Sequence, residues 1–512
     1  MTDASPSPAP PPPPPGPALG PRTAAVLVFA CSAAVLVVEI TALRLLAPYL
    51  GLTLETSTLV IGIALAAIAL GSWSGGRVAD RVDPRRLIGP AMGVSGVAVA
   101  LTPAVVRMAA EWAPALLILV AALSILVPGA LLSAVTPMVT KIRLSTLDET
   151  GTVVGKLSGV GTVGAIAGTV VTGFVLISRL PVSAILVGLG VLLVLGAAAV
   201  EWRTRGWVRA KASVLVAALV AGALASAVAP GGCDAETKYH CAQVIADPDR
   251  DTGRTLVLDG LNHSYVDTAD PTVLAFDYVR ALAAVVDAAF PGGEPLAAYH
   301  LGGGGLTFPR YLAAVRPGTA NRVSEIDPGV VDLDRAELGG LTGTGIDIRV
   351  EDGRMGLQRL ASGSRDLIVG DAFGGVSVPW HLTTLEALDE VRRVLAPTGV
   401  YAANLIDHGE LAFVRAEVAT VAEVFGHVAV LGDPGDLSVD PAGPRGGNIV
   451  VVASDRAIDL HAVQAALDAG VTGWTTISGT ELARWVGEAP VLTDDHAPVD
   501  QLLEPFAVPT RP

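Results

Sequence analysis

The stretch LAAYHLGGGGLTFPRYLAAV, residues 296–315, decides the fold of the C-terminal half of the chain. An apolar run of strand length leads into four consecutive glycines, Gly302–Gly305, and a helical pattern follows. Glycine lets backbone N–H groups approach a ligand without interference from a Cβ atom, and the start of the helix adds partial positive charge. The pattern is typical of nucleotide binding, although a glycine run alone is not specific.

Three acidic residues extend this pattern. Glu325 lies 20 residues beyond Gly305, at the end of the next β-rich run, where a carboxylate can accept both hydroxyls of a ribose. Asp352 and Asp371 end the two runs that follow, IDIRVED and DLIVGD. Ligands of open α/β sheets bind at the carboxyl ends of the strands, so we expect these groups to share one site. Any one of the acids could instead cap a helix, but the ordered set favours a site.

The C-terminal half is strongly acidic. Residues 231–512 contain 19 Lys and Arg against 40 Asp and Glu, a net charge of −21, whereas residues 1–230 contain 15 against 9, a net charge of +6. A domain this acidic repels phosphate backbones, so we expect no nucleic-acid partner. It would attract small cations, polyamines among them. From residue 256 onward β-rich runs alternate with helical stretches, which predicts an α/β domain with a mostly parallel sheet.

The N-terminal half reads as a membrane protein. Residues 1–22 form a Pro-rich tail that cannot bury a core and is not a signal peptide. Beyond it lie apolar segments long enough to cross a lipid bilayer. There are seven: 24–46, 57–76, 87–106, 115–138, 153–178, 182–200 and 211–230. The predicted fold is therefore a multi-span α-helical membrane bundle over residues 23–230, followed by an α/β domain over residues 231–512.

Basic residues predict the orientation of this bundle. The links after the second, fourth and sixth segments hold 11 Lys and Arg, whereas the links on the alternate side hold only Arg44, Arg107 and Arg179. By the positive-inside rule the basic links and the N-terminus are cytoplasmic. Seven spans then predict a multi-pass protein of the cell membrane whose C-terminal domain lies outside the cytoplasm. One span more or fewer would place the C-terminal domain in the cytoplasm instead.

Cysteine usage agrees with this orientation. Cys233 and Cys241 stand eight residues apart in CDAETKYHC, just beyond the last predicted span. A disulfide between them would need an oxidising compartment. A metal site that includes His240 is the alternative. Two cysteines and one histidine are few ligands for a metal ion, so we predict a disulfide and no metal.

Two features of the bundle could be either functional or structural. Glu39 lies inside the first span, where a carboxylate is costly, and it is either functional or paired with Arg44. The fifth span has glycines at four-residue spacing, which favours close helix packing. These are Gly155, Gly159, Gly164 and Gly168.

The motifs of the C-terminal half resemble those of the polyamine aminopropyltransferase (spermidine synthase) family. The resemblance begins at LVLDGLNHSYVD, residues 256–267, runs through HLGGGG, EIDP, EDGR and DAF, and ends near GGNIVVVAS, residues 446–454. It implies a Rossmann-like fold of the methyltransferase type. The first span and GGRVADR, residues 75–81, are similar to the variant of this family that carries a transporter-like membrane segment.

Carried over residue by residue, the resemblance implies a nucleoside site. Gly302, Gly303 and Gly304 would line the pocket, and Glu325 would hold the ribose of decarboxylated S-adenosylmethionine or methylthioadenosine. No prosthetic group is implied, because the sulfonium compound is a co-substrate.

The resemblance also assigns the remaining site residues. Asp352 and Gly353 would meet the adenine, and Asp371 would take the position of the proton acceptor. A protonated amine is no nucleophile, and a carboxylate can both bind the ammonium group and help to remove its proton.

This sequence departs from the family at the amine side of the site. Gly305 replaces the aspartate of the usual GGGD motif, and Gly374 replaces a second aspartate after Asp371. His263 replaces the glutamine of LDGxxQ, and the Tyr-Gln pair that follows has no clear counterpart around Phe276–Tyr278. His263 and His381 could supply replacement polar groups to the substrate, or they could be structural.

Two functions therefore remain open. One is aminopropyl transfer from decarboxylated S-adenosylmethionine to an amine. The other is a non-catalytic membrane protein that binds a nucleoside or a polyamine, or couples such binding to transport. The expected partners are a small amine, an adenine nucleoside and the lipid bilayer, and the chain could form a homo-oligomer.

Overall fold

The computed structural model describes residues 19–50, 53–144, 150–205, 220, 222–225, 233–340, 343–374, 378–439, 446–470 and 473–504. The chain divides into two compact units, which are taken here one at a time. The first comprises residues 1–45 and 58–231, and the second comprises residues 46–57 and 232–512.

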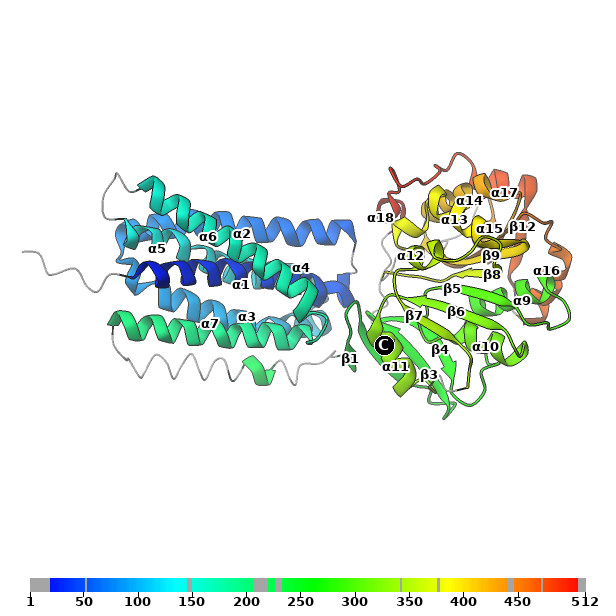
Figure 1. The fold of residues 1–512 in the computed structure, drawn as a ribbon, viewed down its shortest axis with the longest axis horizontal. Coiled ribbons are helices and arrows are strands. Elements are labelled where there is room, and N and C mark those ends of the chain that lie inside the picture. Colours follow the sequence, from blue (N-terminus) through cyan, green and yellow to red (C-terminus); the bar gives the residue numbers. More distant parts are fainter. Residues whose placement is uncertain are drawn as a thin grey trace, which may run out of the picture. The chain divides into compact units, whose positions relative to one another are not determined.

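Long apolar helices build the first unit (Figure 1). In the described part of the chain, six helical stretches are long and apolar enough to cross a membrane. They are Pro21–Leu50 (α1), Leu54–Arg81 (α2), Pro84–Trp112 (containing α3, Ile88–Trp112), Pro114–Arg143 (containing α4, Leu117–Ser133, and α5, Val135–Arg143), Thr150–Leu176 (beginning with α6, Thr150–Val171) and Val182–Arg203 (within α7, Val182–Arg205). These match the first six predicted spans, so the predicted fold class is confirmed. The seventh predicted span, 211–230, and the tail up to residue 18 fall largely or wholly outside the described residues.

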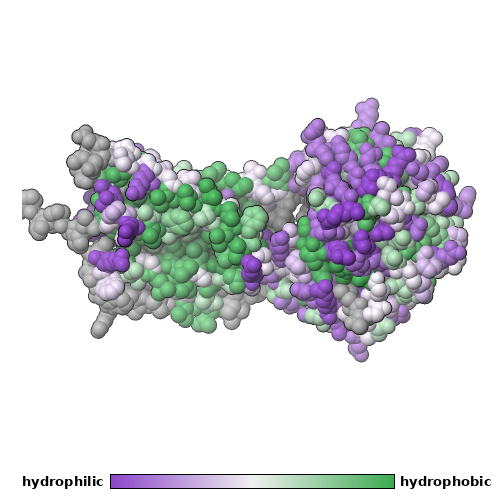
Figure 2. All heavy atoms as spheres, in the orientation of Figure 1, coloured by the Kyte–Doolittle hydropathy of each residue, from purple (hydrophilic) through white to green (hydrophobic). Residues whose placement is uncertain are grey.

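The surface of the first unit is apolar, as Figure 2 shows for the face in view. Large hydrophobic side chains point outward at many positions, with 79% of Phe174, 67% of Leu192 and 59% of Leu65 exposed. Such a surface is unfavourable in water but stable in lipid, which is as apolar as these side chains. Exposure and helix length together fit insertion into a bilayer.

The glycines of α6 divide into two groups. A Cβ atom on Gly164 or Gly168 would lie 2.4 or 2.5 Å from a backbone oxygen of α1, so glycine is required for this close helix contact. Gly155 and Gly159 have nothing within 4 Å. The predicted packing role therefore applies to the C-terminal half of the glycine pattern.

The second unit begins with a small antiparallel sheet. Its four strands run in the order β1-β2-β3-β4. They are Ala235–Glu236, Cys241–Ala246, Gly253–Leu258 and Leu261–Asp267. The motif LVLDGLNHSYVD thus forms the hairpin β3–β4.

An eight-stranded sheet forms the body of the second unit, with strand order β12-β10-β11-β9-β8-β5-β6-β7. The strands are β5 (Ala297–Leu301), β6 (Ala320–Glu325), β7 (Asp347–Val350), β8 (Arg365–Gly370), β9 (Leu395–His408), β10 (His427–Gly432), β11 (Gly446–Ser454) and β12 (Thr475–Ser478). The pairs from β9 to β7 are parallel, and β11, β10 and β12 continue the sheet antiparallel. The expected mostly parallel sheet is therefore mixed.

Helices cover both faces of this sheet (Figure 1). Alternating residues of the apolar strands face opposite sides, so Tyr401 and Ala403 join one core and Val400 and Ala402 the other. The first core is covered by α12 (Gly353–Gln358), α13 (Leu385–Val394), α14 (Ala412–Val424) and α17 (Gly479–Val486), and the second by α9 (Asp277–Ala289), α10 (Thr307–Val315) and α16 (Leu460–Gly470). The remaining helices are the short α11 (Pro328–Ala336), α15 (Pro434–Leu437) and α18 (Val499–Leu502).

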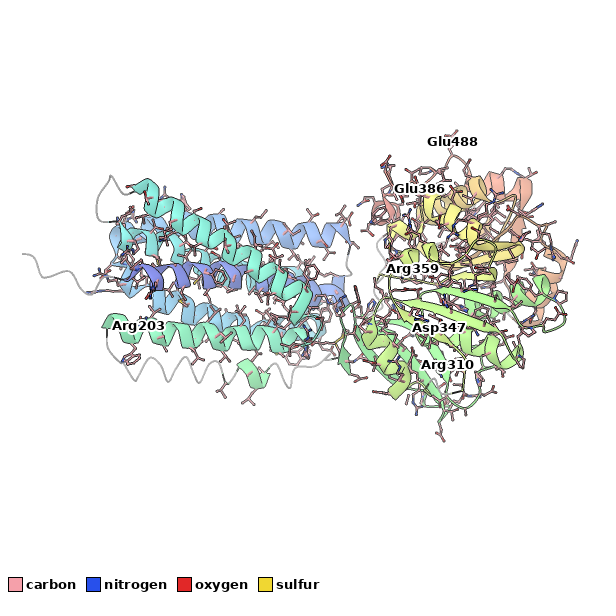
Figure 3. The ribbon with its side chains drawn as sticks, in the orientation of Figure 1. Arg203, Arg310, Asp347, Arg359, Glu386 and Glu488 are labelled. Atoms are coloured by element: carbon pink, nitrogen blue, oxygen red, sulfur yellow. A yellow bond between two sulfur atoms is a disulfide. The ribbon has the colours of Figure 1, made fainter. Side chains whose placement is uncertain are left out.

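The edge strand β7 is charged. Asp347, labelled in Figure 3, forms ion pairs with Arg322 of β6 and Arg349 of its own strand, each at 3.0 Å. Charged side chains on an edge strand discourage pairing with another chain.

Candidate functional site

Most of the predicted site residues lie at the carboxyl ends of β5, β6, β7 and β8. The turn after β5 passes so close to the end of β8 that a Cβ atom on Gly302 would lie 2.3 Å from the backbone oxygen of Asp371. Gly302 and Gly304 also have positive φ angles, +92° and +48°, which favour glycine. The glycine run therefore brings the ends of two neighbouring strands together.

A cavity of about 810 Å³ opens at this place in the second unit. Its wall contains every predicted nucleoside and substrate residue: His263, Gly302, Gly303, Gly304, Glu325, Asp352, Gly353 and Asp371. Residues more than 100 positions apart in the chain thus form one site. The volume is in the range of ordinary small-molecule sites.

Glu325 is fixed by backbone amides. Its Oε2 accepts hydrogen bonds from the N–H groups of Gly303 (2.8 Å) and Gly304 (3.2 Å), and its Oε1 accepts one from Asp327 (2.8 Å). A carboxylate has about four acceptor positions, so it can still receive a bond from a ligand hydroxyl. The sequence did not predict that this side chain also holds the glycine turn.

Asp352 is held as an anion at the start of α12. Burial opposes its ionisation, but hydrogen bonds from the Met355 amide (2.9 Å) and the His381 imidazole (2.8 Å) lower its pKa below the ordinary value. His381 therefore contacts the adenine side of the predicted site, through Asp352. The adjacent Gly353 lies against Leu301, whose Cδ2 would be 2.9 Å from a Cβ atom at that position.

Asp371 has a different environment. Its Oδ1 accepts a hydrogen bond from Asn404 Nδ2 (2.9 Å) and its Oδ2 accepts one from the Tyr278 hydroxyl (3.2 Å). Burial raises the pKa of Asp371 to about 6, although both hydrogen bonds act in the opposite direction. A carboxyl group with such a pKa can change its protonation state near neutral pH.

Three residues of this site were missed by the sequence analysis. They are Tyr278, Asn404 and Asn448, which donates to Asn404 Oδ1 at 2.9 Å. Both asparagines interrupt apolar runs, YAANLI in β9 and GGNIVVV in β11. A polar residue inside a buried strand was the available signal, because such a group needs a partner. Tyr278 carried no comparable signal.

The amine side contains the departures noted above. The Gly305 amide donates to Ser264 Oγ at 2.9 Å, and a Cβ atom on Gly305 would lie 2.9 Å from both Ser264 Cβ and Val266 Cγ2. The hairpin β3–β4 therefore occupies the space that a side chain at this position would need. Gly374 is exposed, at the edge of the described segment 343–374.

His263 contributes a buried nitrogen to the cavity wall. Its Nε2 has no hydrogen-bond partner in the described part of the chain. Burial lowers the pKa of His263 to about 4, the nearby His240 acts in the same direction, and Asp259 opposes both. His240 lies next to it, with ring centroids 6.2 Å apart, and contacts Asp259 through Nδ1 at 2.8 Å. Burial thus favours the neutral form of the His263 ring, which lines the cavity.

Cys233 and Cys241 form a disulfide, with Cα atoms 5.2 Å apart. Cys31 is a buried free thiol in α1. Among the described residues, no group of three or more His, Cys, Asp or Glu side chains could hold a metal ion.

Comparison with known proteins agrees with the motifs. No family model matches the chain. The chain is 32% identical over 165 residues to a polyamine aminopropyltransferase of Vibrio vulnificus and 28% identical over 142 residues to one of Chromobacterium violaceum. These matches cover 32% and 28% of this chain and 53% of each relative, so the chain spans about half the length of the curated relatives it matches.

A solved structure matches a larger part of this chain than the two curated relatives do. The crystal structure of a protein described as a probable spermidine synthase from Corynebacterium glutamicum is 31% identical in sequence, over 52% of this chain and 97% of that chain, with a TM-score of 0.47. Through its second unit, the chain belongs to the polyamine aminopropyltransferase (spermidine synthase) family.

Proposed function

We propose that the second unit binds an adenine nucleoside and transfers an aminopropyl group from decarboxylated S-adenosylmethionine to an amine. One observation carries this proposal: Asp371 lies in the wall of the same cavity as the glycine turn and Glu325. A group that can accept a proton is thus within one cavity with groups suited to a nucleoside.

The reaction needs little from the protein beyond position and charge. The amine nitrogen attacks the carbon next to the sulfonium, the carbon–sulfur bond breaks, and methylthioadenosine leaves as a neutral thioether. Asp371 takes the proton that the amine loses. The sulfonium is already activated, so holding the two reactants in line supplies most of the acceleration.

The charge of the cavity suits cationic reactants. Its wall includes the carboxyl groups of Glu325, Asp352 and Asp371, and none of the described residues that line it is Lys or Arg. Both the sulfonium donor and a polyamine are cations. The acidic surroundings raise their local concentration.

A second function is favoured by the amine side of the cavity. With Gly305 and Gly374 in place of two carboxylates, the site has fewer anions to hold an ammonium group than the family motifs provide. A protein that binds a nucleoside or a polyamine without turnover, or couples its binding to transport, would tolerate these changes. For the catalytic function, we expect putrescine to be a poor acceptor and a larger or different amine to be preferred.

For the location of the second unit, we propose the outside of the cytoplasmic membrane. The 11-to-3 distribution of Lys and Arg among the links supports this orientation, and so does a disulfide, which persists in oxidising compartments. A C-terminal reporter that is active only in the cytoplasm should be inactive. An active reporter, or free labelling of both thiols without reductant, would contradict this topology.

The test of function is product formation by the full-length protein in detergent or lipid nanodiscs. Decarboxylated S-adenosylmethionine is offered with putrescine, spermidine and other amines, and methylthioadenosine release is followed by mass spectrometry. Release should require an amine and should be lost in Asp371→Asn but kept in Asp389→Asn, a matched change at an exposed aspartate of α13. Nucleoside binding without product from any amine would favour the second function.

A further inference from the structure

The disulfide closes a short loop beside the nucleoside site. Cys233 and Cys241 are joined across eight positions, and within the loop β1 pairs with the start of β2. The Thr237 amide donates to the backbone oxygen of His240 at 2.8 Å, and the Thr237 hydroxyl oxygen accepts from the His240 amide at 2.8 Å. The loop therefore has a defined conformation, which the disulfide and these bonds maintain together.

This loop is attached to Asp327. The Thr237 hydroxyl and the Tyr239 amide both donate to Asp327 Oδ2, the latter at 3.2 Å. Asp327 is fully buried, and its Oδ1 accepts from the Gly329 amide at the start of α11. A buried carboxylate depends on such donors, because leaving it unpaired is costly. The loop therefore supplies part of what keeps Asp327 in place.

Asp327 is in turn attached to the predicted ribose-binding residue. Its backbone amide donates to Glu325 Oε1 at 2.8 Å, while Glu325 Oε2 accepts from Gly303 and Gly304. Consecutive hydrogen bonds thus run from the disulfide loop through Asp327 and Glu325 to the glycine turn. Only Asp327 and Glu325 stand between the loop and the glycine turn along this path.

The loop also reaches the cavity by a second route. His240, next to Cys241, lines the cavity and contacts Asp259 Oδ2 through Nδ1 at 2.8 Å. The Cys241 amide donates to the other oxygen of the same carboxylate, Asp259 Oδ1, at 2.9 Å. Asp259 therefore binds both the disulfide-bonded residue and a residue of the cavity wall.

We propose that Asp327 is a positioning residue that couples the Cys233–Cys241 disulfide to nucleoside affinity, so that reduction of this disulfide weakens nucleoside binding. The proposal rests on the proposed nucleoside site. The reductant is a dithiol: its two sulfurs become a cyclic disulfide, the Cys233–Cys241 bond breaks, and both cysteines gain a proton and become thiols. Both cysteines are partly exposed, so a dithiol can reach them.

The physical cause is the freedom of the opened loop. A closed loop of this length loses much of the conformational entropy that the open chain has. In the open loop, ordering Thr237 and Tyr239 so that they donate to Asp327 costs more conformational entropy. Asp327 is then held less firmly, and so is Glu325, which accepts a hydrogen bond from the Asp327 amide. Coupling between two sites typically changes affinity by about 5- to 150-fold, and we expect a roughly tenfold weaker affinity for methylthioadenosine after reduction.

In the experiment, methylthioadenosine is titrated into the full-length protein, either oxidised or treated with dithiothreitol. Far-UV circular dichroism verifies that both forms are folded. The oxidised form should bind about tenfold more tightly, and reoxidation should restore that affinity. The double variant Cys233→Ser/Cys241→Ser should bind like the reduced form and should not respond to dithiol. Because coupling is reciprocal, saturating methylthioadenosine should also protect the disulfide from reduction by the same factor.

A matched pair of variants isolates the role of Asp327. Thr237→Val removes the hydroxyl at Asp327 while the disulfide remains, and it should reproduce the loss of affinity. Thr272→Val, whose hydroxyl donates only to the exposed Asp270 among the described contacts, should bind like the wild type. Equal affinity of the oxidised and reduced wild type would overturn the coupling and leave the nucleoside site standing. Absence of binding by the oxidised wild type would instead overturn the proposed function itself.

Discussion

The two ends of the cavity hold their carboxylates in different ways. At the nucleoside end, Glu325 accepts hydrogen bonds from three backbone N–H groups. Asp352 accepts one hydrogen bond from a backbone N–H group and one from the His381 imidazole. At the amine end, Asp371 is bound by two neutral side chains, Tyr278 and Asn404.

Under the proposed function, this difference separates nucleoside binding from proton transfer. Hydrogen bonds hold the pKa of Asp352 below its ordinary value, so that group is a fixed anion at neutral pH. Burial raises the pKa of Asp371 to about 6, so that group can take up and release a proton. A fixed anion suits recognition, and a carboxylate with a raised pKa suits a general base.

The largest expected effect comes from the amine end. Asp371→Asn keeps the shape of the side chain but removes its charge, so turnover should fall by roughly 10²- to 10⁴-fold, the range for a general base. Methylthioadenosine affinity should stay close to that of the wild type. Single-turnover kinetics and a binding titration on the same sample measure both quantities. Turnover at the wild-type rate would remove the distinction between the two ends.

Removal of the carboxylate at the nucleoside end should give the opposite result. Glu325→Ala removes a charged acceptor, which is typically worth about 1–3 kcal/mol, so methylthioadenosine should bind roughly 5- to 150-fold more weakly. Any remaining turnover at saturating donor should be less affected than in Asp371→Asn. Calorimetry measures the affinity, and an unchanged value would mean that Glu325 holds only the glycine turn.

Restoring the aspartate of the family motif should fail. Gly305→Asp places a Cβ atom 2.9 Å from Ser264 Cβ and Val266 Cγ2, so the hairpin must shift. Overpacking of this kind costs about 1–3 kcal/mol of unfolding free energy. Denaturant unfolding measures the loss. A Gly305→Asp protein that is as stable as the wild type and gains activity with putrescine would show that one side chain is enough to restore putrescine use.

The two ends of the cavity should also differ in their pH dependence. Asp371 acts as a base only when ionised, so the rate should rise with pH through about 6 and fall about tenfold per pH unit well below it. Methylthioadenosine binding should change little over the same range, because the pKa of Asp352 lies below its ordinary value. A rate that is flat between about pH 5 and about pH 7 would argue against Asp371 as the base.

Sequence reasoning identified Glu325, Asp352 and the glycine run more readily than the partners of Asp371, for a physical reason. Glu325, Asp352 and the glycine run are each marked locally, since they follow apolar strands. The partners of Asp371 are 93 positions upstream, at Tyr278, and 33 downstream, at Asn404, and they meet only through sheet order and helix docking. One chain alone does not reveal that order.

The same reasoning explains the remaining differences in the fold. Six helical stretches were located from apolar length alone, because each satisfies its own backbone within one segment. The antiparallel extension by β11, β10 and β12 was missed, because strand direction depends on the pairing partner and not on the apolar pattern of the strand itself.

Binding of methylthioadenosine to the oxidised, full-length protein is the decisive measurement for the proposed nucleoside site. The nucleoside end is complete in its glycines and carboxylates, so calorimetry should show saturable binding to one site per chain. Turnover is not needed for this result, and neither is the identity of the acceptor amine. Saturable binding that Asp371→Asn retains and Glu325→Ala weakens is the predicted result, and absence of binding by the wild-type protein would contradict the account.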